Sequence, residues 1–255
     1  ADSFKEFNPV RRPKNVKVVT MTKYAEEFTV PIAYPALDLP NTIGEVVSRA
    51  GWKQWRIAEK EKEAHVTNFF NGGRIKPFTG EQREIVSSRK MKGPEYIAHP
   101  EMSAQQVVDA VLQSAADETR LYIVNLANPD MIGHTGDLGA TVKAMRVTDD
   151  CLKQMIEPLR ARTDSAIIIT ADHGNAEELL DPLTKGEDTQ HSTRNVPALF
   201  VAQGLEGAQD TGKSLESLAQ EAPIGTLVDI SPTALYFLGI DKPVEMTGSR
   251  LITVE

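Results

Sequence analysis

Cysteine and long hydrophobic runs are almost absent from this sequence of 255 residues. The single cysteine, Cys151, excludes an internal disulfide framework and a cysteine-type zinc finger, and it makes a reducing cytoplasm the expected compartment. The longest apolar stretches, residues 166–169 and 196–202, have the length of strands. We therefore expect neither a transmembrane helix nor a signal peptide, and no membrane partner.

Basic residues are also in the minority. The chain has 28 lysines and arginines against 36 aspartates and glutamates, which gives a formal net charge of −8. This balance disfavours a nucleic-acid partner held by a broad basic surface. No repeat with a period of 20 to 50 residues and no low-complexity stretch occurs, so solenoids and linkers are excluded. The composition is that of a globular protein with room for one large domain or two small ones.

The sequence alternates between strand-like and helix-like segments. Apolar runs rich in β-branched residues predict buried strands, and segments with helical periodicity separate them. The helix at 42–50 is expected to have Asn41 as its cap and Gly51 as its stop, and Ser103 with Gln106 has the form of a capping box. The predicted helices are 42–50, 103–116, 138–160 and 229–238, and the predicted strands are 16–20, 121–126, 166–170 and 198–201. This order predicts an α/β fold with a mainly parallel sheet and helices on both faces.

A proline-containing stretch around residues 34–40 predicts a hinge. Residues 1–36 have too little apolar content to form a core alone, so we expect them to be the end of something larger. Residues 37–255 are expected to form the main domain.

Carboxylates and imidazoles flank the predicted strands. Asp130 and His134 follow the strand at 121–126, Asp172 and His173 follow the strand at 166–170, and His191 lies in the polar segment before the next strand. In open α/β sheets, ligands bind at the carboxyl ends of the strands. We therefore expect these side chains to meet at one edge of one sheet.

Imidazole nitrogens and carboxylate oxygens without a thiolate suit Mn²⁺, Zn²⁺ or Fe²⁺. The number of such groups exceeds what one tetrahedral ion needs, so the sequence predicts two divalent ions, an arrangement suited to phosphoryl transfer. The alternative is that each Asp-His pair is a helix cap with a hydrogen-bonded histidine. Two pairs together with His191 favour metal binding.

Lys62 is a further candidate, within the charged stretch 59–63. One interpretation is a solvated charged turn. The other is a lysine that polarises a phosphoryl oxygen or stabilises a leaving group. His65 and His99 lack a paired carboxylate pattern, and we expect both to be structural.

Several short motifs occur together in this order. They are RIAE at 56–59, EK at 61–62, AHVT at 64–67, FFNGG at 69–73, PEMSA at 100–104, NPDM at 128–131, GHTG at 133–136, TADHGNAE at 170–177 and EMTG at 245–248. In this combination the sequence resembles the cofactor-independent phosphoglycerate mutases, a family of the alkaline-phosphatase-like superfamily, over nearly the whole chain. Any one motif alone would indicate only the superfamily.

The resemblance implies an isomerase of glycolysis and gluconeogenesis that interconverts 2- and 3-phosphoglycerate through a phosphoserine. It implies two manganese ions and no 2,3-bisphosphoglycerate, although the ligand set also tolerates Zn²⁺ or Co²⁺. Carried over by motif, the ligands of one ion would be Asp130, His134 and His191, and the ligands of the other would be Asp172 and His173. Lys62 would contact the transferred phosphoryl group, and Glu61 and Asn175 would be supporting residues.

The sequence also departs from the family pattern. The family chain is longer at its N-terminus, where it holds a further strand with a metal-binding aspartate, the Asn-Ser-Glu segment with the nucleophilic serine, and most of an inserted transferase domain. No Asn-Ser-Glu triplet occurs here, and residues 1–36 resemble only the tail of the transferase domain. Glu63 stands where the family commonly has tyrosine. We therefore expect the activity to belong to a longer polypeptide and this chain alone to be inactive.

Two other functions stay open from the sequence. One is a stand-alone metal-dependent hydrolase of phosphomonoesters, with water in place of the serine. The other is a non-catalytic metal-binding half that pairs with another chain, such as the missing N-terminal part, because truncation leaves a sheet edge and part of the core uncovered.

Overall fold

The structure is a computed structural model that describes residues 15–23, 28–35, 39–115, 118–160, 162–181, 183–184, 186–205, 212–218 and 220–252. The chain forms two compact units, Ala1–Asp38 and Leu39–Glu255. Within the described part of the first unit, Thr20 and Ile32 form an isolated parallel bridge. The predicted strand at 16–20 is therefore wrong, because only this single bridge forms there among the described residues.

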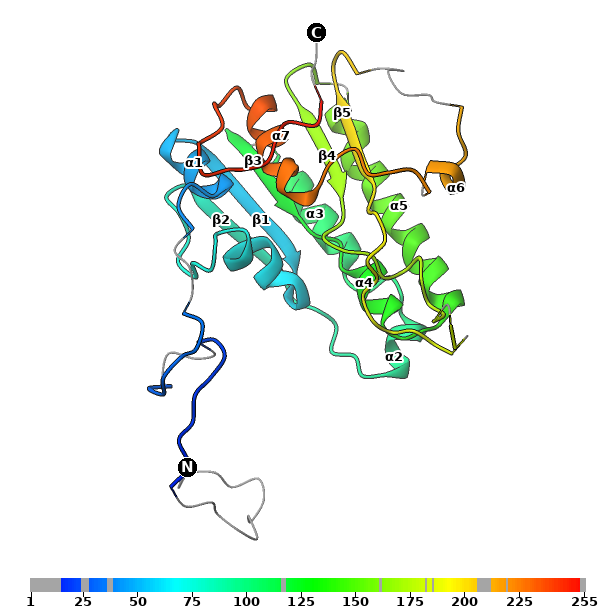
Figure 1. The fold of residues 1–255 in the computed structure, drawn as a ribbon. Helices are drawn as coiled ribbons and strands as arrows, with labels where there is room; N and C mark the ends of the chain where they lie inside the picture. The colour runs from blue at the N-terminus through cyan, green and yellow to red at the C-terminus, as the bar shows by residue number, and fades with distance from the viewer. Residues whose placement is uncertain are drawn as a thin grey trace. The chain divides into compact units, whose positions relative to one another are not determined.

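The second unit holds the regular structure (Figure 1). Its strands are β1 (Lys53–Glu59), β2 (Glu81–Val86), β3 (Thr119–Val124), β4 (Ala166–Thr170) and β5 (Ala198–Ala202). Its helices are α1 (Ile43–Arg49), α2 (Pro94–Ala98), α3 (Ala104–Ser114), α4 (Asn128–Gly133), α5 (Leu138–Arg160), α6 (Leu215–Leu218) and α7 (Ile230–Phe237), with 3-10 turns η1 (Lys60–Lys62) and η3 (Leu227–Asp229) and the π-helix η2 (His65–Phe69). In the described residues, no helix combines the length and apolar character needed to cross a membrane.

The strands form a parallel sheet and a separate antiparallel pair. The parallel sheet has the order β2-β1-β3, and Ile57 of β1 lies opposite Glu84 of β2 and Val124 of β3. Strands β4 and β5 pair in antiparallel orientation. The predicted α/β fold with a parallel sheet is confirmed, with the difference that the described strands form two hydrogen-bonded sheets instead of one.

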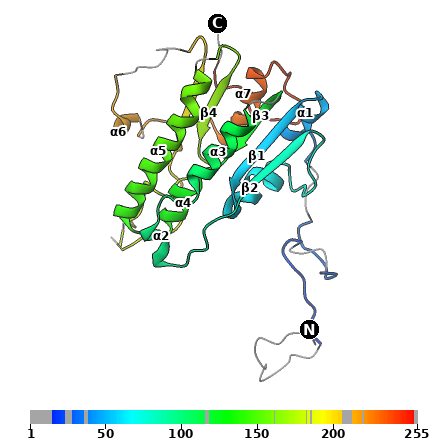
Figure 2. The same ribbon diagram turned by 180° about the vertical axis from the view of Figure 1, so that it is seen from behind.

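Helices cover both faces of the parallel sheet, as predicted. On β3, Leu121 and Ile123 point to one side and pack with α1 and α7, where Leu235 is fully buried. Tyr122 and Val124 point to the other side and pack with α3 and α5. Figure 1 looks onto the side of α1 and α7, and Figure 2 onto the side of α3 and α5. The alternation follows from the two-residue period of a strand.

The β4–β5 pair is less buried than the sequence predicts. The three isoleucines of β4 are only half-buried, and Leu199 of β5 is 50% exposed. Among the described residues no third strand pairs with β4 or β5. The prediction of buried strands is wrong here because, within the described ranges, no further strand flanks this pair.

Some predicted helix ends are confirmed and others are corrected; Ser103 is the N-cap of α3 as predicted. Helix α1 stops at Gly51, whose φ of 76° only glycine adopts without strain. Its N-cap is Thr42 rather than Asn41. The capping box of Ser103 does not form among the described residues; the backbone N–H of Ser103 donates instead to Glu59 Oε2 at 3.1 Å. Helix α5 and strand β4 have the predicted bounds.

Candidate metal centre

The predicted site residues gather where strands end. Strands β1 and β3 are parallel, so their carboxyl ends meet at one edge of the sheet. Lys62 follows β1 within η1, and Asp130 follows β3 within α4. Because β5 is antiparallel to β4, the segment before β5 begins beside the end of β4, and this brings His191 next to His173.

The short helix α4 carries two of these groups. Its start is fixed by Pro129, whose ring presets a helical φ, and by Asn128, whose buried amide donates to the carbonyl of Pro100 at 2.7 Å. Asp130 and His134 are four residues apart and share one face of the helical turn. On the opposite side, Ile132 is fully buried in a cluster with α5. This packing holds the face with Asp130 and His134 toward the strand ends.

Three ligand atoms converge on one point. The Nε2 atoms of His134 and His191 each lie 3.2 Å from Asp130 Oδ1, and the two Nε2 atoms lie 3.1 Å apart. Among the described residues, one group of three or more metal-capable side chains has all its ligand atoms within 4.8 Å of one another. Its members are Asp130, His134 and His191.

This donor set fits a divalent ion. Two atoms that each lie about 2.1 Å from one ion are about 3.0 to 3.4 Å apart at octahedral and tetrahedral angles. The observed separations of 3.1 and 3.2 Å match the edges of such a coordination sphere. Two imidazole nitrogens and one carboxylate oxygen suit Mn²⁺, Zn²⁺ or Co²⁺. The geometry therefore supports the use of a divalent metal and does not select the ion.

The backbone orients the imidazole of His134. Its Nδ1 lies 2.6 Å from the carbonyl oxygen of Thr189, which only accepts hydrogen bonds, so Nδ1 is the protonated nitrogen. The lone pair is then on Nε2, which faces Asp130 and His191. Metal-ligating histidines are usually oriented by such a second hydrogen bond.

Asp130 is also held by two other side chains. Its Oδ2 forms an ion pair with Lys62 Nζ, and its Oδ1 accepts a hydrogen bond from Asn175 Nδ2 at 3.0 Å. Burial acts to raise the pKa of Asp130, but the hydrogen bond and charge of Lys62 outweigh it, so the net pKa lies below its usual range. Lys62 is thus not a solvated residue of a charged turn, because its side chain is only 8% exposed.

The second predicted ligand pair lies beside the first group without joining it. The His173 ring stacks on the His191 ring, with a centroid distance of 3.6 Å and an interplanar angle of 18°. The Asp172 carboxylate lies 3.6 Å from His173 Nε2 and is 54% exposed. The described residues thus bring together three of the five predicted ligands and place the other two next to them.

The predicted supporting residues divide in the same way. Asn175 contacts Asp130, as a support would. The carboxylate of Glu61 instead accepts a hydrogen bond from the Ser88 hydroxyl. Glu63, which stands where the family commonly has tyrosine, pairs with Lys60.

Two residues near the centre carry signals that the sequence analysis missed. His65 has a buried Nδ1 without a hydrogen-bond partner among the described residues. Burial lowers the pKa of His65, the charge of Lys62 lowers it further, and Asp172 and Asp130 act in the opposite direction. His65 therefore lies within electrostatic reach of the site. It has no adjacent carboxylate in the sequence, and its place in a π-helix, a form common at functional sites, is visible only in the structure.

Gly133 is the second missed residue. A Cβ atom at Gly133 would lie 2.1 Å from Asn175 Oδ1, so any larger residue would displace Asn175. The absence of a side chain at Gly133 lets Asn175 reach across α4 to Asp130. A glycine inside a short motif is a weak signal by itself, and its partner is 42 residues away in the chain (175 − 133).

Comparison with known proteins identifies the class. Residues 14–242 match the family described as the metalloenzyme superfamily. The match covers most of the chain, so this chain belongs to the metalloenzyme superfamily.

Within that class, the similar proteins share one name. The chain is 42% identical over 255 residues to a 2,3-bisphosphoglycerate-independent phosphoglycerate mutase of Coxiella burnetii. That alignment covers 100% of this chain and 46% of the relative. It is 41% identical over 252 residues to the mutase of that name from Moorella thermoacetica. This second alignment covers 97% of this chain and 46% of the relative. The chain thus spans about half the length of the curated relatives that it matches.

A solved structure agrees with these relatives. The fold is similar to that of a Leishmania mexicana phosphoglycerate mutase whose crystal structures were determined at low cobalt concentration, with a TM-score of 0.74 and 25% sequence identity. The alignment covers 100% of this chain and 47% of that chain. The resemblance seen in the sequence motifs is confirmed by both comparisons.

Proposed function

We propose that this chain supplies the metal centre of a cofactor-independent phosphoglycerate mutase, an isomerase that interconverts 2- and 3-phosphoglycerate in the cytoplasm. The observation that carries the proposal is the convergence of Asp130, His134 and His191 beside the buried amine of Lys62. Mutases of this name are similar to the chain over its full length. The part of the reaction that lies in this chain would then be metal binding and contact with the transferred phosphoryl group.

The proposed ligands follow from the geometry and the family resemblance. Asp130, His134 and His191 would hold one ion, and Asp172 with His173 would provide part of a second site. We propose Mn²⁺, with Zn²⁺ or Co²⁺ as ions that the same donors tolerate. When bound, a divalent ion supplies positive charge that polarises a phosphoryl oxygen.

Lys62 would act on the phosphoryl group through its own charge. Its ammonium group is almost fully buried and is held in place by Asp130. A buried positive charge stabilises the negative charge that develops on phosphoryl oxygens more strongly than an exposed one. Lysine serves as a point charge here and needs no fixed bidentate geometry.

The nucleophilic serine of the mutase reaction would lie outside the matched region. Ser192, which follows His191, donates its hydroxyl hydrogen to Glu177 and is therefore engaged in holding the loop. We propose that the serine and the arginines that grip the substrate belong to the other half of the relatives' length. A phosphoserine cannot form without that serine, so the isolated chain would have no mutase turnover.

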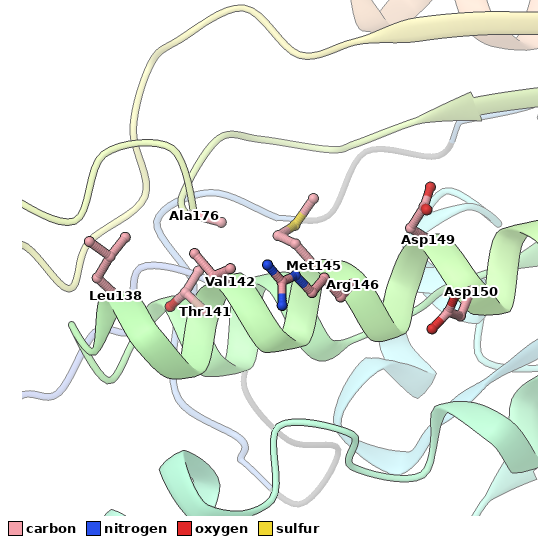
Figure 3. A pocket seen from close by; sticks show the side chains of 8 residues that line it. All are labelled: Leu138, Thr141, Val142, Met145, Arg146, Asp149, Asp150 and Ala176. Carbon is pink, nitrogen blue, oxygen red and sulfur yellow. The ribbon is translucent and has the colours of Figure 1, made fainter.

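That other half would also cover an apolar groove on α5 (Figure 3). Leu138, Val142 and Met145 lie along one side of α5 and are 67%, 43% and 47% exposed. Together with Ala176 and the polar residues Thr141, Arg146, Asp149 and Asp150 they line a groove of about 580 Å³. Exposed apolar side chains in a row are typical of a contact surface. We propose that the part of the mutase not matched by this chain packs into this groove.

A coupled assay of 3-phosphoglycerate conversion tests the proposed function. One sample is the chain alone with Mn²⁺, and the other is a chimera in which this chain replaces the matched part of the Coxiella burnetii relative. We expect turnover by the chimera, its loss in the Asp172→Asn chimera, and no turnover by the chain alone.

Two results would contradict the proposal. A folded chimera that binds Mn²⁺ without converting 3-phosphoglycerate would remove the mutase assignment. Steady Mn²⁺-dependent release of phosphate from a nitrophenyl ester by the chain alone would favour a stand-alone hydrolase instead.

A further inference from the structure

His191 reaches the metal centre from a loop that is far from Asp130 in the chain. The loop is closed by two antiparallel bridges, Gly174 with Ser192 and Leu180 with Glu187. At the first bridge, the backbone N–H of Ser192 donates to the carbonyl of Gly174 at 2.9 Å. The segment after β4 and the segment that carries His191 are therefore held side by side.

Glu177 ties these two segments together through its carboxylate. Its Oε2 accepts the backbone N–H of Asn175 at 2.9 Å, and its Oε1 accepts the hydroxyl hydrogen of Ser192. A Cβ atom at Gly174 would lie 2.3 Å from both Glu177 Oε1 and Ser192 Oγ. The glycine thus leaves the space in which the Glu177–Ser192 hydrogen bond forms.

Both partners of Glu177 are connected directly to the candidate metal centre, one by a hydrogen bond and one by the chain. Asn175 donates to Asp130 Oδ1 at 3.0 Å, and Ser192 directly follows His191, whose Nε2 lies 3.2 Å from the same oxygen. Glu177 itself does not belong to the converging ligand group among the described residues. Its two hydrogen bonds act on the positions of Asn175 and His191.

We propose that Glu177 is the positioning residue that fixes His191 against Asp130 and His134. This inference rests on the proposed metal centre and adds the residue that assembles it. A carboxylate suits the task because it accepts at both oxygens and donates at neither. A glutamine keeps one acceptor and replaces the other by an NH2 group, which cannot accept the hydroxyl hydrogen of Ser192. Glu177→Gln therefore removes the charge-assisted hydrogen bond from Ser192 at nearly constant size.

The neighbouring Glu178 provides a matched control. Its carboxylate accepts a hydrogen bond from Arg194 Nε at 2.6 Å, and the Arg194 side chain is 65% exposed. Glu178→Gln therefore changes the same charge in the same segment without touching the contacts of Glu177.

The test compares Glu177→Gln, Glu177→Ala and Glu178→Gln with the unmodified chain. The ring NMR resonances of His191 and His65 are recorded in the metal-free protein, and the Kd of Mn²⁺ is measured by calorimetry. We expect both Glu177 variants to shift the His191 resonances, to leave those of His65 in place, and to weaken Mn²⁺ binding by about 10- to 100-fold. Glu178→Gln should stay within about twofold of the unmodified chain, because the Glu178–Arg194 ion pair includes none of the three proposed ligands.

The proposal is overturned if a folded Glu177→Ala variant keeps the His191 resonances and an Mn²⁺ Kd within twofold. If Glu177→Ala does not fold, the near-isosteric Glu177→Gln decides by the same two readouts. Absence of Mn²⁺ binding by the unmodified chain would contradict the proposed function. The histidine resonances of the metal-free protein would still decide the role of Glu177.

Discussion

Two opposite charges at the centre depend on each other. The side chains of Lys62 and Asp130 are 8% and 16% exposed, and they form an ion pair. A buried pair adds little stability by itself, but removal of one partner leaves the other charge uncompensated. In the metal-free protein, Lys62 therefore compensates the negative charge of the proposed ligand Asp130.

Replacement of this lysine should destabilise the metal-free protein more than the Mn²⁺-bound protein. We expect Lys62→Met to lower the free energy of unfolding by about 1 to 3 kcal/mol without metal, because Asp130 loses its cation. With saturating Mn²⁺ the difference between variant and unmodified chain should shrink. Urea unfolding with and without Mn²⁺ measures both. Lys60→Met is the control, since Lys60 is 66% exposed. An equal loss under both conditions would refute the idea.

A second buried charge, Glu59, makes stability depend on pH. Glu59 is 1% exposed, and desolvation raises its pKa from 4.5 to about 7 against the hydrogen bond from Ser103. The folded state therefore binds this proton more tightly than the unfolded state does. The resulting stability is present below about pH 4.5 and is lost as the pH rises toward 7.

Removal of the Glu59 charge should abolish this part of the pH dependence. Relative to the unmodified chain, Glu59→Gln should gain about 2 to 3 kcal/mol in free energy of unfolding between pH 5 and pH 8, from the size of the pKa shift. Denaturant unfolding at the two pH values gives the number. The exposed Glu84 on β2 offers a control substitution, Glu84→Gln, with no such gain. A constant difference between Glu59→Gln and the unmodified chain at both pH values would contradict the assignment.

Among the secondary-structure elements, those with a clear hydrophobic pattern were predicted from the sequence. Strands that bury polar side chains were not. Helix α5 and strand β4 have the predicted bounds because a long helical period and a run of three isoleucines are unambiguous. Strands β1 and β2 were missed. Gln54, Arg56 and Glu59 of β1 are fully or almost fully buried, and a pattern search assigns such residues to the surface.

Among the described residues, helix α5 has one apolar side that is covered and a second that is partly exposed. Cys151 and Met155 pack toward α3, whereas Val142 and Met145 line the groove of Figure 3. We expect Met145→Glu to change the stability of the isolated chain by less than about 1 kcal/mol, because Met145 is 47% exposed. In the chimera with the Coxiella burnetii relative it should destabilise by about 2 kcal/mol or more, because the charge becomes buried.

Thermal unfolding of the isolated chain and of the chimera compares the two cases. Leu112→Glu is the control, since Leu112 of α3 is 40% exposed and lies outside the groove. It should have the same effect in both proteins. Equal effects of Met145→Glu in both would show that the groove stays open in the longer protein.

For the molecule as a whole, the positions of the strand ends predicted where the candidate metal centre lies. They did not predict the side-chain contacts that hold the centre together. Asp130, His134 and His191 were predicted to meet because loops at the carboxyl ends of strands share an edge. The ion pair of Lys62 and the loop contact of Glu177 were not predictable, because each joins residues through a side-chain geometry that no local pattern encodes. The number of sheets was also wrong, since strand order is not readable from single segments.

The half-length match to the relatives gives these findings their context. The described residues bring three candidate ligands together, yet the chain spans only 46% of a similar mutase. The described residues thus support metal binding by this chain, whereas we propose that mutase turnover needs a longer polypeptide.

Calorimetric titration of the chain with Mn²⁺ tests whether the converging side chains bind a metal ion. We predict saturable binding that is strongly weakened in His134→Ala and in His191→Ala, because each variant lacks one converging nitrogen. Binding should be unchanged in His99→Ala, because the His99 ring pairs with Glu101 instead. Binding should also weaken at acidic pH, because protons compete with the ion for the ligand atoms. Absence of binding, or equal affinity in all three variants, would contradict the metal centre.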